Sequence, residues 1–195
     1  VATLTGIHDH LRLLYSRIAQ LDGYDYTAQH FSFNHKLGAC PKCTGQGIEK
    51  KCDPQAIIID PNLPLFSGAL TQQKAARYFT NITGQFVAIL NEIFLQKNWD
   101  SSLPWKDLSN EIQTAVLYGT GNQEWETNWT FETKTRSGNQ QIKAKWLGFC
   151  NYIDDEYQRR ANNKNIAGLL ELLQDRPCST CNGNRLKDNL LEVKF

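Results

Sequence analysis

The sequence predicts an α+β fold that has a base closed by two paired-cysteine motifs and an inserted domain of helices and a β-hairpin or small antiparallel sheet. Three observations predict it. Two Cys-x-x-Cys motifs stand 134 residues apart, several segments carry apolar residues at helical spacing, and one segment alternates with a period of two. We therefore expect 1–52 and 176–195 to form the base and 53–175 to form the inserted domain.

Composition limits the class of protein. The 195 residues suit one large domain or two small ones, and 41% of them are hydrophobic, enough for a core. A net charge of +1 excludes a strongly basic nucleic-acid tail and an acidic disordered domain. No apolar run approaches the ~20 residues of a membrane span and no signal peptide is recognisable, so no membrane partner is expected. The absence of Met leads us to expect a fragment of a longer protein.

The first segment with helical spacing is 5–20, with Thr5 as a suitable N-cap. One face of this expected amphipathic helix carries Ile7, Leu11, Leu14 and Ile18. The following segment, 21–36, is expected to be irregular and leads into the first cysteine motif.

Four of the six cysteines form two similar motifs, Cys40-Pro-Lys-Cys43 and Cys178-Ser-Thr-Cys181. Two thiolates at this spacing can bind one metal from a tight turn, and the glycine two residues after each motif lets backbone N–H groups turn toward the sulfurs. Two such knuckles complete a closed four-thiolate site, so we predict one structural Zn²⁺ and hence a zinc-knuckle base. One alternative is two disulfides, which are typical of secreted proteins, and no signal peptide is recognisable here. The other is a redox-active pair, which is typical of a single motif beside a strand and not of two similar knuckles.

The remaining metal-ligating and catalytic candidates are few. Cys52 and Cys150 are expected to be ordinary buried cysteines, the alternative being a second metal site. His35 would be a zinc ligand only if a cysteine were displaced, and four thiolates already suffice. The sequence contains no Walker A, His-Glu-x-x-His or Gly-x-Ser-x-Gly motif, so no catalytic residue and no nucleotide site is expected here.

Periodicity and capping signals place the elements of the inserted domain. The β-branched run Ile57-Ile-Ile59, bounded by prolines, predicts a strand. Ser109 is a suitable N-cap for a short helix that ends at Gly119. Further helices are expected over 71–97, 151–160 and 165–174.

The period-two segment, 124–149, is expected to be a β-hairpin with Gly138-Asn139 at its turn. This pairing places Lys134 opposite Lys143, which costs stability, and Glu132 opposite Lys145. The hairpin end is a candidate for contact with an anionic partner, through Lys134, Arg136, Lys143 and Lys145. The alternative is a solvated hairpin end, and the neighbouring aromatic residues fit core packing better than base stacking.

A second basic cluster contains Arg159 and Arg160 and is offset by the acids of 154–156. This cluster fits a mixed-charge exposed face, and its two arginines are further candidates for DNA contact. Residues 53–177 carry 12 basic and 14 acidic side chains, a net charge of −2. Any DNA binding must therefore come from local patches and should be modest and salt-sensitive.

Several ordered stretches resemble one family. They begin at Thr5, Phe31, Gly38, Asp53, Asp60, Gly68, Pro104, Leu117 and Arg176. Phe31-Ser-Phe-Asn and the knuckle that follows it resemble the first insertion-flanking knuckle of UvrA, and Arg176-Pro-Cys-Ser-Thr-Cys-Asn-Gly-Asn-Arg resembles the closing one. UvrA is the damage-recognition subunit of the bacterial excinuclease in nucleotide excision repair, an ABC-type ATPase. The resemblance covers nearly the whole chain.

The resemblance implies zinc held by Cys40, Cys43, Cys178 and Cys181. It also implies a mobile insertion domain that contacts double-stranded DNA around a lesion. The parent protein would be a homodimeric DNA-repair protein of the bacterial cytoplasm that takes part in the SOS response. In the family, ATP is bound by Walker and signature motifs outside this segment. ATP is therefore expected only in the parent protein, and the fragment is not expected to be an enzyme.

One stretch departs from the family pattern. Where the family has a UvrB-binding domain and a further Cys-x-x-Cys, only ten residues, 21–30, are present. The chain therefore resembles the shortened UvrA-like paralogues, some of them associated with resistance to DNA-damaging drugs, although an engineered deletion would give the same sequence. This gap argues against a partnership with UvrB. The alternative functions are a zinc-stabilised protein-interaction module, as in the DnaJ family, and a structural insertion without direct DNA contact.

Overall fold

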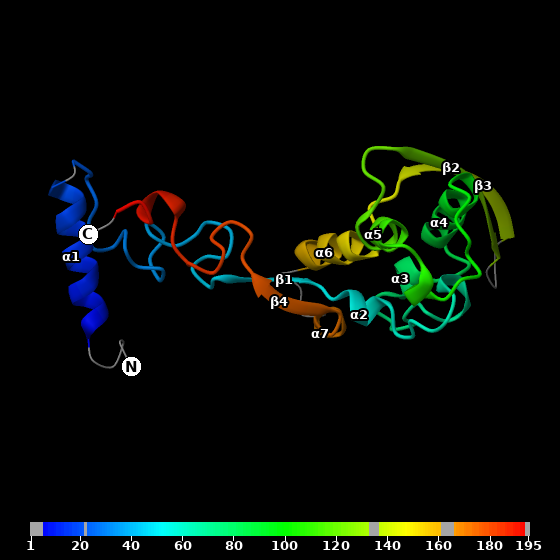
Figure 1. Cartoon of the computed structure of the whole chain (residues 1–195), viewed down its shortest axis with the longest axis horizontal. Coiled ribbons are helices and arrows are strands. Elements are labelled where there is room, and N and C mark those ends of the chain that lie inside the picture. Colours follow the sequence, from blue (N-terminus) through cyan, green and yellow to red (C-terminus); the bar gives the residue numbers. More distant parts are fainter. Residues whose placement is uncertain (1–5, 22, 133–136, 161–165, 194–195) are drawn as a thin grey trace. The chain divides into compact units, whose positions relative to one another are not determined.

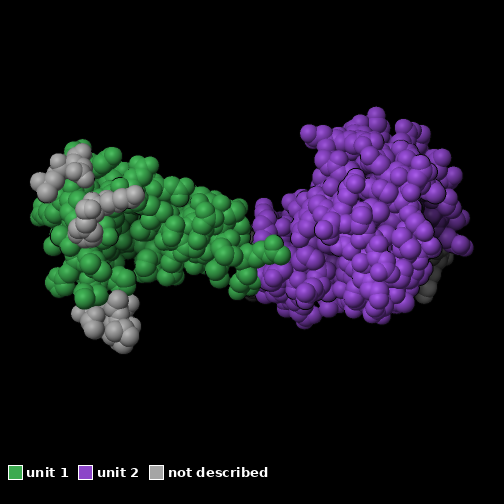
Figure 2. Space-filling model, viewed as in Figure 1, with its two compact units in different colours: residues 1–50, 175–195 green, residues 51–174 purple. Residues whose placement is uncertain are grey.

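The computed structural model describes residues 6–21, 23–132, 137–160 and 166–193. The chain divides into two compact units, Val1–Lys50 with Asp175–Phe195 (unit 1) and Lys51–Gln174 (unit 2), shown in Figure 2. The chain leaves unit 1 within strand β1 (Ile48–Cys52) and returns within strand β4 (Leu173–Pro177). These two strands pair as a two-stranded sheet.

Helices make up most of the remaining regular structure, and Figure 1 shows their order along the chain. The α-helices are α1 (Ile7–Leu21), α2 (Pro54–Ile57), α3 (Arg77–Thr80), α4 (Gln85–Gln96), α5 (Asn110–Tyr118), α6 (Phe149–Arg160) and α7 (Ala167–Leu170). Short 3-10 helices are η1 (Leu65–Ser67), η2 (Trp105–Asp107) and η3 (Asp188–Leu190). A second two-stranded sheet is formed by β2 (Glu124–Glu132) and β3 (Ser137–Lys145). The predicted α+β class is therefore correct. Among the described helices, none is both long and apolar enough to cross a bilayer.

Three predicted helices are confirmed at the positions where the sequence carries their signals. Helix α1 covers the amphipathic segment, and its apolar side chains Ile7, Leu11 and Leu14 stay 49%, 41% and 45% exposed. Helix α5 begins after Ser109, whose Oγ accepts a hydrogen bond from the N–H of Ile112 at 3.4 Å. Helix α5 ends at Gly119, which has φ 98°, as predicted. Helix α6 covers the helix predicted over 151–160.

The strand predicted at 57–59 is wrong. Asp53 caps a helix there, because its carboxylate accepts the N–H of Gln55 at 3.0 Å. Pro54 takes the first helical position, where its fixed φ suits the helix and its missing N–H costs nothing. The β-branched run thus closes a short helix at Ile57, and Ile58 forms only an isolated bridge with Leu70.

The long helix predicted over 71–97 is interrupted. Helix α3 ends at Asn81, which takes an extended backbone and accepts a hydrogen bond from the N–H of Thr83 through its side chain. Gly84 then takes the N-cap position of α4. The helix predicted over 165–174 is also too long, because pairing with β1 makes its last residues extended.

The hairpin forms with a different register from the one predicted. Glu124 lies opposite Lys145 and Glu126 opposite Lys143, whereas Gly138 lies opposite Phe131 inside β3 and not at the turn. In the observed register both Lys143 and Lys145 lie opposite glutamates, whereas the predicted register places Lys143 opposite another lysine, so the observed register is favoured. A side chain at Gly138 would meet the Phe131 ring at 2.9 Å, so the glycine makes room for an aromatic neighbour across the strands.

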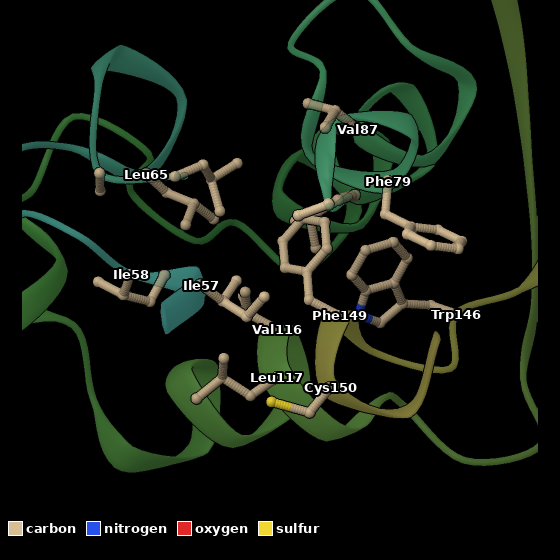
Figure 3. Close-up of a cluster of buried hydrophobic side chains, with 14 of the residues drawn as sticks. Ile57, Ile58, Leu65, Phe79, Val87, Val116, Leu117, Trp146, Phe149 and Cys150 are labelled. Atoms are coloured by element: carbon tan, nitrogen blue, oxygen red, sulfur yellow. The ribbon is translucent and has the colours of Figure 1, made fainter. Parts of the chain in front are cut away.

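One cluster of 24 buried residues forms the core of unit 2. The fully buried side chains of Trp146 and Phe149 lie next to each other (Figure 3). Their rings meet edge to face, with centroids 5.1 Å apart. Trp125 on β2 is 2% exposed and belongs to this core. Trp129 is half-buried outside it, donates to the carbonyl of Thr83 at 2.9 Å and packs against Phe131, with ring centroids 5.0 Å apart.

Candidate metal centre and nucleic-acid interface

Four cysteines meet in unit 1. Their sulfurs all lie within 4.8 Å of one another, and all four residues are buried. The sulfurs of Cys40 and Cys178 are 3.9 Å apart, and those of Cys43 and Cys181 are 3.7 Å apart. Four sulfurs bound at about 2.3 Å to a central zinc would lie about 3.8 Å apart in a regular tetrahedron. The donor set and its spacing therefore fit a four-thiolate metal ion.

The two knuckles have the same backbone conformation. Residues one and two places after the second cysteine have positive φ in both, 49° and 85° at Thr44 and Gly45, and 48° and 89° at Asn182 and Gly183. The fourth residue also has positive φ, 79° at Gly47 and 71° at Arg185. This turn directs the N–H of the fourth residue at the second sulfur, with N–S distances of 3.2 Å and 3.4 Å. Such N–H bonds stabilise negative sulfur, as a bound metal requires.

Gly45 is constrained in a way that Gly183 is not. A Cβ at Gly45 would lie 1.9 Å from the carbonyl oxygen of Phe33, whereas a Cβ at Gly183 would meet no heavy atom within 4 Å. Both positions need positive φ, which disfavours any side chain. The first knuckle therefore requires glycine for space and for conformation, and the second for conformation alone.

Contacts across the motifs hold the knuckles against each other. The N–H of Cys178 donates to the carbonyl of Gly47 at 2.9 Å, and the N–H of Cys40 donates to the carbonyl of Arg185 at 2.9 Å. The Arg185 guanidinium donates to the carbonyl of Gly45 at 2.8 Å and lies 4.2 Å from the Phe33 ring centre. The site is thus built by both ends of the chain.

An ion pair borders the four cysteines. Lys42 Nζ lies 3.0 Å from a carboxylate oxygen of Glu49, and that carboxylate accepts the N–H of Ser179 at 3.0 Å. Burial opposes the charged form of Glu49, but the Lys42 and Ser179 bonds outweigh it and lower the pKa of Glu49. These contacts connect the first knuckle, through Lys42, to the second, through Ser179.

The pKa values of Cys43 and Cys181 are shifted in opposite directions. Burial disfavours the thiolate of Cys43, but N–H bonds from Gly47 and Gly45 and the neighbouring thiols lower its pKa. Burial, reinforced by neighbouring thiols, raises the pKa of Cys181 in spite of the N–H of Arg185. Metal binding must therefore release protons from this group.

The remaining cysteines and His35 lie outside this centre. Cys52 and Cys150 are 3% and 1% exposed and belong to the core of unit 2. The hydrogen bond with the neighbouring Cys150 thiol, reinforced by burial, raises the pKa of Cys52. Within the described residues, the metal-binding cluster does not include His35, whose Nδ1 accepts the N–H of Leu37 at 3.3 Å.

The structure describes only two of the four basic residues predicted at the hairpin end. Lys134 and Arg136 lie outside the described residues. Lys143 is exposed and its Nζ lies 3.2 Å from a carboxylate oxygen of Glu124, and Lys145 donates to the side chain of Asn122 at 3.3 Å. The described outward face also carries Glu124, Glu126 and Glu132, so it is a mixed-charge face.

The second basic candidates, Arg159 and Arg160, both pair with the carboxylate of Glu156. The neighbouring Asp154 is 8% exposed and accepts both the N–H of Cys52 at 2.7 Å and the ammonium of Lys51 at 3.0 Å. Asp154 and Glu156 are therefore buried, so the prediction of an exposed mixed-charge face is wrong for these two acids. Sequence reasoning also missed Lys74, which lines the same clefts as Arg160.

Comparison with known proteins gives three results. A family model described as the UvrA DNA-binding domain matches residues 53–170. UvrABC system protein A of Vibrio cholerae is 33% identical over 160 residues, which are 80% of this chain and 16% of that protein. The Synechocystis protein of the same name is 29% identical over 166 residues, or 85% of this chain and 16% of its own length. The chain thus spans about one sixth of these relatives.

A solved structure agrees in fold. The crystal structure of UvrA2 from Deinococcus radiodurans matches with a TM-score of 0.58 and 21% identity. The match covers 100% of this chain and 24% of that one. The arrangement of helices and small sheets is therefore shared along the whole chain.

Proposed function

The chain belongs to the UvrA DNA-binding domain family, and from this premise we propose that it is the zinc-containing DNA-contacting module of a UvrA-type ABC ATPase in nucleotide excision repair. One observation carries the proposal. The family match covers 53–170, which is nearly the whole of unit 2, and the four cysteines lie in the sequence on both sides of it. Unit 2 would contact DNA, and unit 1 would hold the ends of the insertion.

The metal in this proposal is one structural Zn²⁺. Four buried cysteines, with N–H bonds to the sulfurs of Cys43 and Cys181 and no non-cysteine ligand in the cluster, are typical of a structural and not a catalytic zinc site. Bound zinc would cross-link the start and end of unit 1. The Lys42–Glu49 pair and the Arg185 contacts would then keep the two knuckles in register.

The proposed DNA contacts are local, because residues 53–177 carry a net charge of −2. We place them at the exposed Lys143 and Lys145 of β3, at Lys134 and Arg136, and at Arg159 and Arg160. Damage sensing belongs to the same proposal, since a lesion distorts and softens the duplex that such contacts follow.

The parent protein in this proposal is a bacterial cytoplasmic ATPase that acts as a homodimer. ATP would be bound outside this chain, so the chain itself is proposed not to be an enzyme. UvrB is not proposed as a partner, because only ten residues, 21–30, occupy the place of its binding domain.

The test is fluorescence anisotropy of the zinc-loaded chain with plain and lesion-bearing duplex DNA across a salt series. A log–log salt slope of roughly −2 to −4 would support a few phosphate contacts. Tighter binding to the lesion-bearing duplex would support damage sensing within this chain. No binding at low salt would reject DNA contact and leave a structural or protein-interaction insertion.

The hairpin is tested by changing its four basic residues, Lys134, Arg136, Lys143 and Lys145, to glutamine together. Loss of affinity and a shallower salt slope are expected, because each lost phosphate contact lowers the slope by about 1. Unchanged affinity would remove the hairpin from the proposed interface without removing the DNA-binding role of the chain.

A further inference from the structure

A cationic surface joins α3 to the end of α6, two segments that stand some 80 positions apart in the sequence. Lys74 and Arg160 line the same two clefts there, of about 390 and 330 Å³. Gly168 and Leu169 complete the first cleft, and Tyr78, Phe79, Glu156 and Arg159 complete the second. The tertiary structure therefore gathers basic side chains that are dispersed in the sequence.

Positive charge is in excess on this surface. Arg159 and Arg160 share one carboxylate, that of Glu156, whose side chain is only 10% exposed. The two arginine side chains remain 72% and 48% exposed, so the buried carboxylate positions them while leaving N–H groups toward solvent. Neither Lys74 nor Arg77 forms an ion pair with any described residue, and both are exposed.

The backbone places Lys74 and Arg77 together. The N–H of Arg77 donates to the carbonyl of Gln73 at 2.9 Å, which makes this stretch a helical turn. Residues three positions apart on such a turn lie on the same side, so the two cations present one face. Neither cleft is lined by Asp155, the exposed acid on α6.

An aromatic side chain completes the surface. Tyr78 is 67% exposed, yet its ring packs against Phe86 at a centroid distance of 5.3 Å, and its hydroxyl oxygen accepts the Gln85 amide at 3.2 Å. The ring is thus positioned before any partner arrives. Exposed aromatic rings beside cations are the arrangement that single-stranded or unstacked bases bind.

We propose that five residues, Lys74, Arg77, Tyr78, Arg159 and Arg160, form a DNA-binding surface, here called the α3–α6 surface. Its four cations bind the DNA phosphate backbone and Tyr78 stacks on an unpaired base. The inference rests on the proposed DNA-binding function and extends it to Lys74, Arg77 and Tyr78, which no sequence motif marks. The cations would fix position on the backbone, and Tyr78 would favour DNA whose stacking is broken.

The test uses the zinc-loaded chain and two fluorescent duplexes, one fully paired and one with a central unpaired stretch. The double variant Lys74→Gln with Arg77→Gln should bind both duplexes about 5- to 20-fold more weakly at low salt, with a salt slope smaller by about 2. Tyr78→Ala should lower the ratio of the affinities for the unpaired and the paired duplex by at least about 5-fold, whereas Tyr78→Phe should keep that ratio.

A charge-matched control separates this surface from net charge. Arg17 and Lys36 are exposed in unit 1, and changing both to glutamine removes the same two charges. We expect this variant to change affinity less than about twofold. Tryptophan fluorescence verifies the fold of the unit 2 variants, and zinc content together with amide hydrogen exchange verifies that of the Arg17 and Lys36 control in unit 1.

Three results would separate failure of the inference from failure of the proposed function. Wild-type chain that binds neither duplex overturns both. Wild-type binding that Lys74→Gln with Arg77→Gln leaves unchanged in affinity and slope overturns only the α3–α6 surface and leaves the proposed function standing. An equal loss in the Arg17 and Lys36 control also overturns it.

Discussion

The two units of this chain are held together by different kinds of interaction. Among the described residues, 24 buried residues form one core in unit 2, whereas the buried cluster of unit 1 consists of the four cysteines. The helix of unit 1 leaves Ile7, Leu11 and Leu14 half-exposed, so little apolar area is buried by them. Small units with little core need a metal or another cross-link to fold. The comparison teaches that removing metal and removing core should damage different halves of the chain.

The largest effect expected is the loss of zinc. Cys178→Ser with Cys181→Ser should reduce metal content from one zinc per chain to near zero and unfold unit 1, since metal binding and folding are coupled, with apparent free energies of about 10–16 kcal/mol in zinc-finger peptides. All five tryptophans lie in unit 2, so their fluorescence should stay native-like. Elemental analysis and amide hydrogen exchange measure the two effects.

Chelator treatment of the wild-type chain is the matched control, because it removes metal without changing the sequence. Stoichiometric zinc in the double serine variant would reject the four-cysteine ligand set. Loss of the native tryptophan signal together with the metal would show that unit 2 also depends on zinc, and would remove the contrast between the units.

Phe149→Ala should have the converse effect. This ring is fully buried against Trp146, and truncating a buried Phe costs about 3–5 kcal/mol through lost burial and the cavity left behind. Denaturant unfolding followed by tryptophan fluorescence should show the loss in unit 2. Zinc content should remain one per chain, and a fall in zinc content would mean that the metal site requires the core.

A pair of glycine variants tests the difference between the two knuckles of unit 1. Gly183→Ala should cost about 1–2 kcal/mol because alanine disfavours positive φ. Gly45→Ala should cost more, since its Cβ would also meet the Phe33 carbonyl oxygen at 1.9 Å. Competition with a chromophoric chelator measures both as losses of zinc affinity. Equal losses would contradict the close approach seen in the first knuckle.

The smallest effect concerns one helix cap in unit 2. Ser109→Ala should destabilise unit 2 by about 1 kcal/mol, because the N–H of Ile112 loses its side-chain acceptor. The measurement is the thermal midpoint by tryptophan fluorescence, with Ser109→Asp as a control that restores an acceptor. Zinc affinity should not change. An alanine variant as stable as wild type would show that this cap contributes nothing.

Local signals in the sequence were sufficient for several features. The spacing of Cys40, Cys43, Cys178 and Cys181 predicted one shared site, and the structure brings their sulfurs together. Ser109 predicted the start of a helix correctly, because the N-cap bond spans only three residues. The ordered motifs also indicated the UvrA family, which the family model matches over 53–170. Signals of this kind depend on near neighbours or on a covalent spacing that folding does not alter.

Other features were decided only by tertiary structure. In the observed register of β2 with β3, Glu126 lies opposite Lys143 and Phe131 lies opposite Gly138. The Gly138-Asn139 pair, taken alone, predicted a turn at a position that lies inside β3. Likewise, Lys74 and Arg160 share a cleft only because α3 packs beside α6. The sequence by itself thus determined the cysteine cluster, the helix cap at Ser109 and the family. Cross-strand pairing and surface charge needed the fold, because both depend on residues that are distant along the chain.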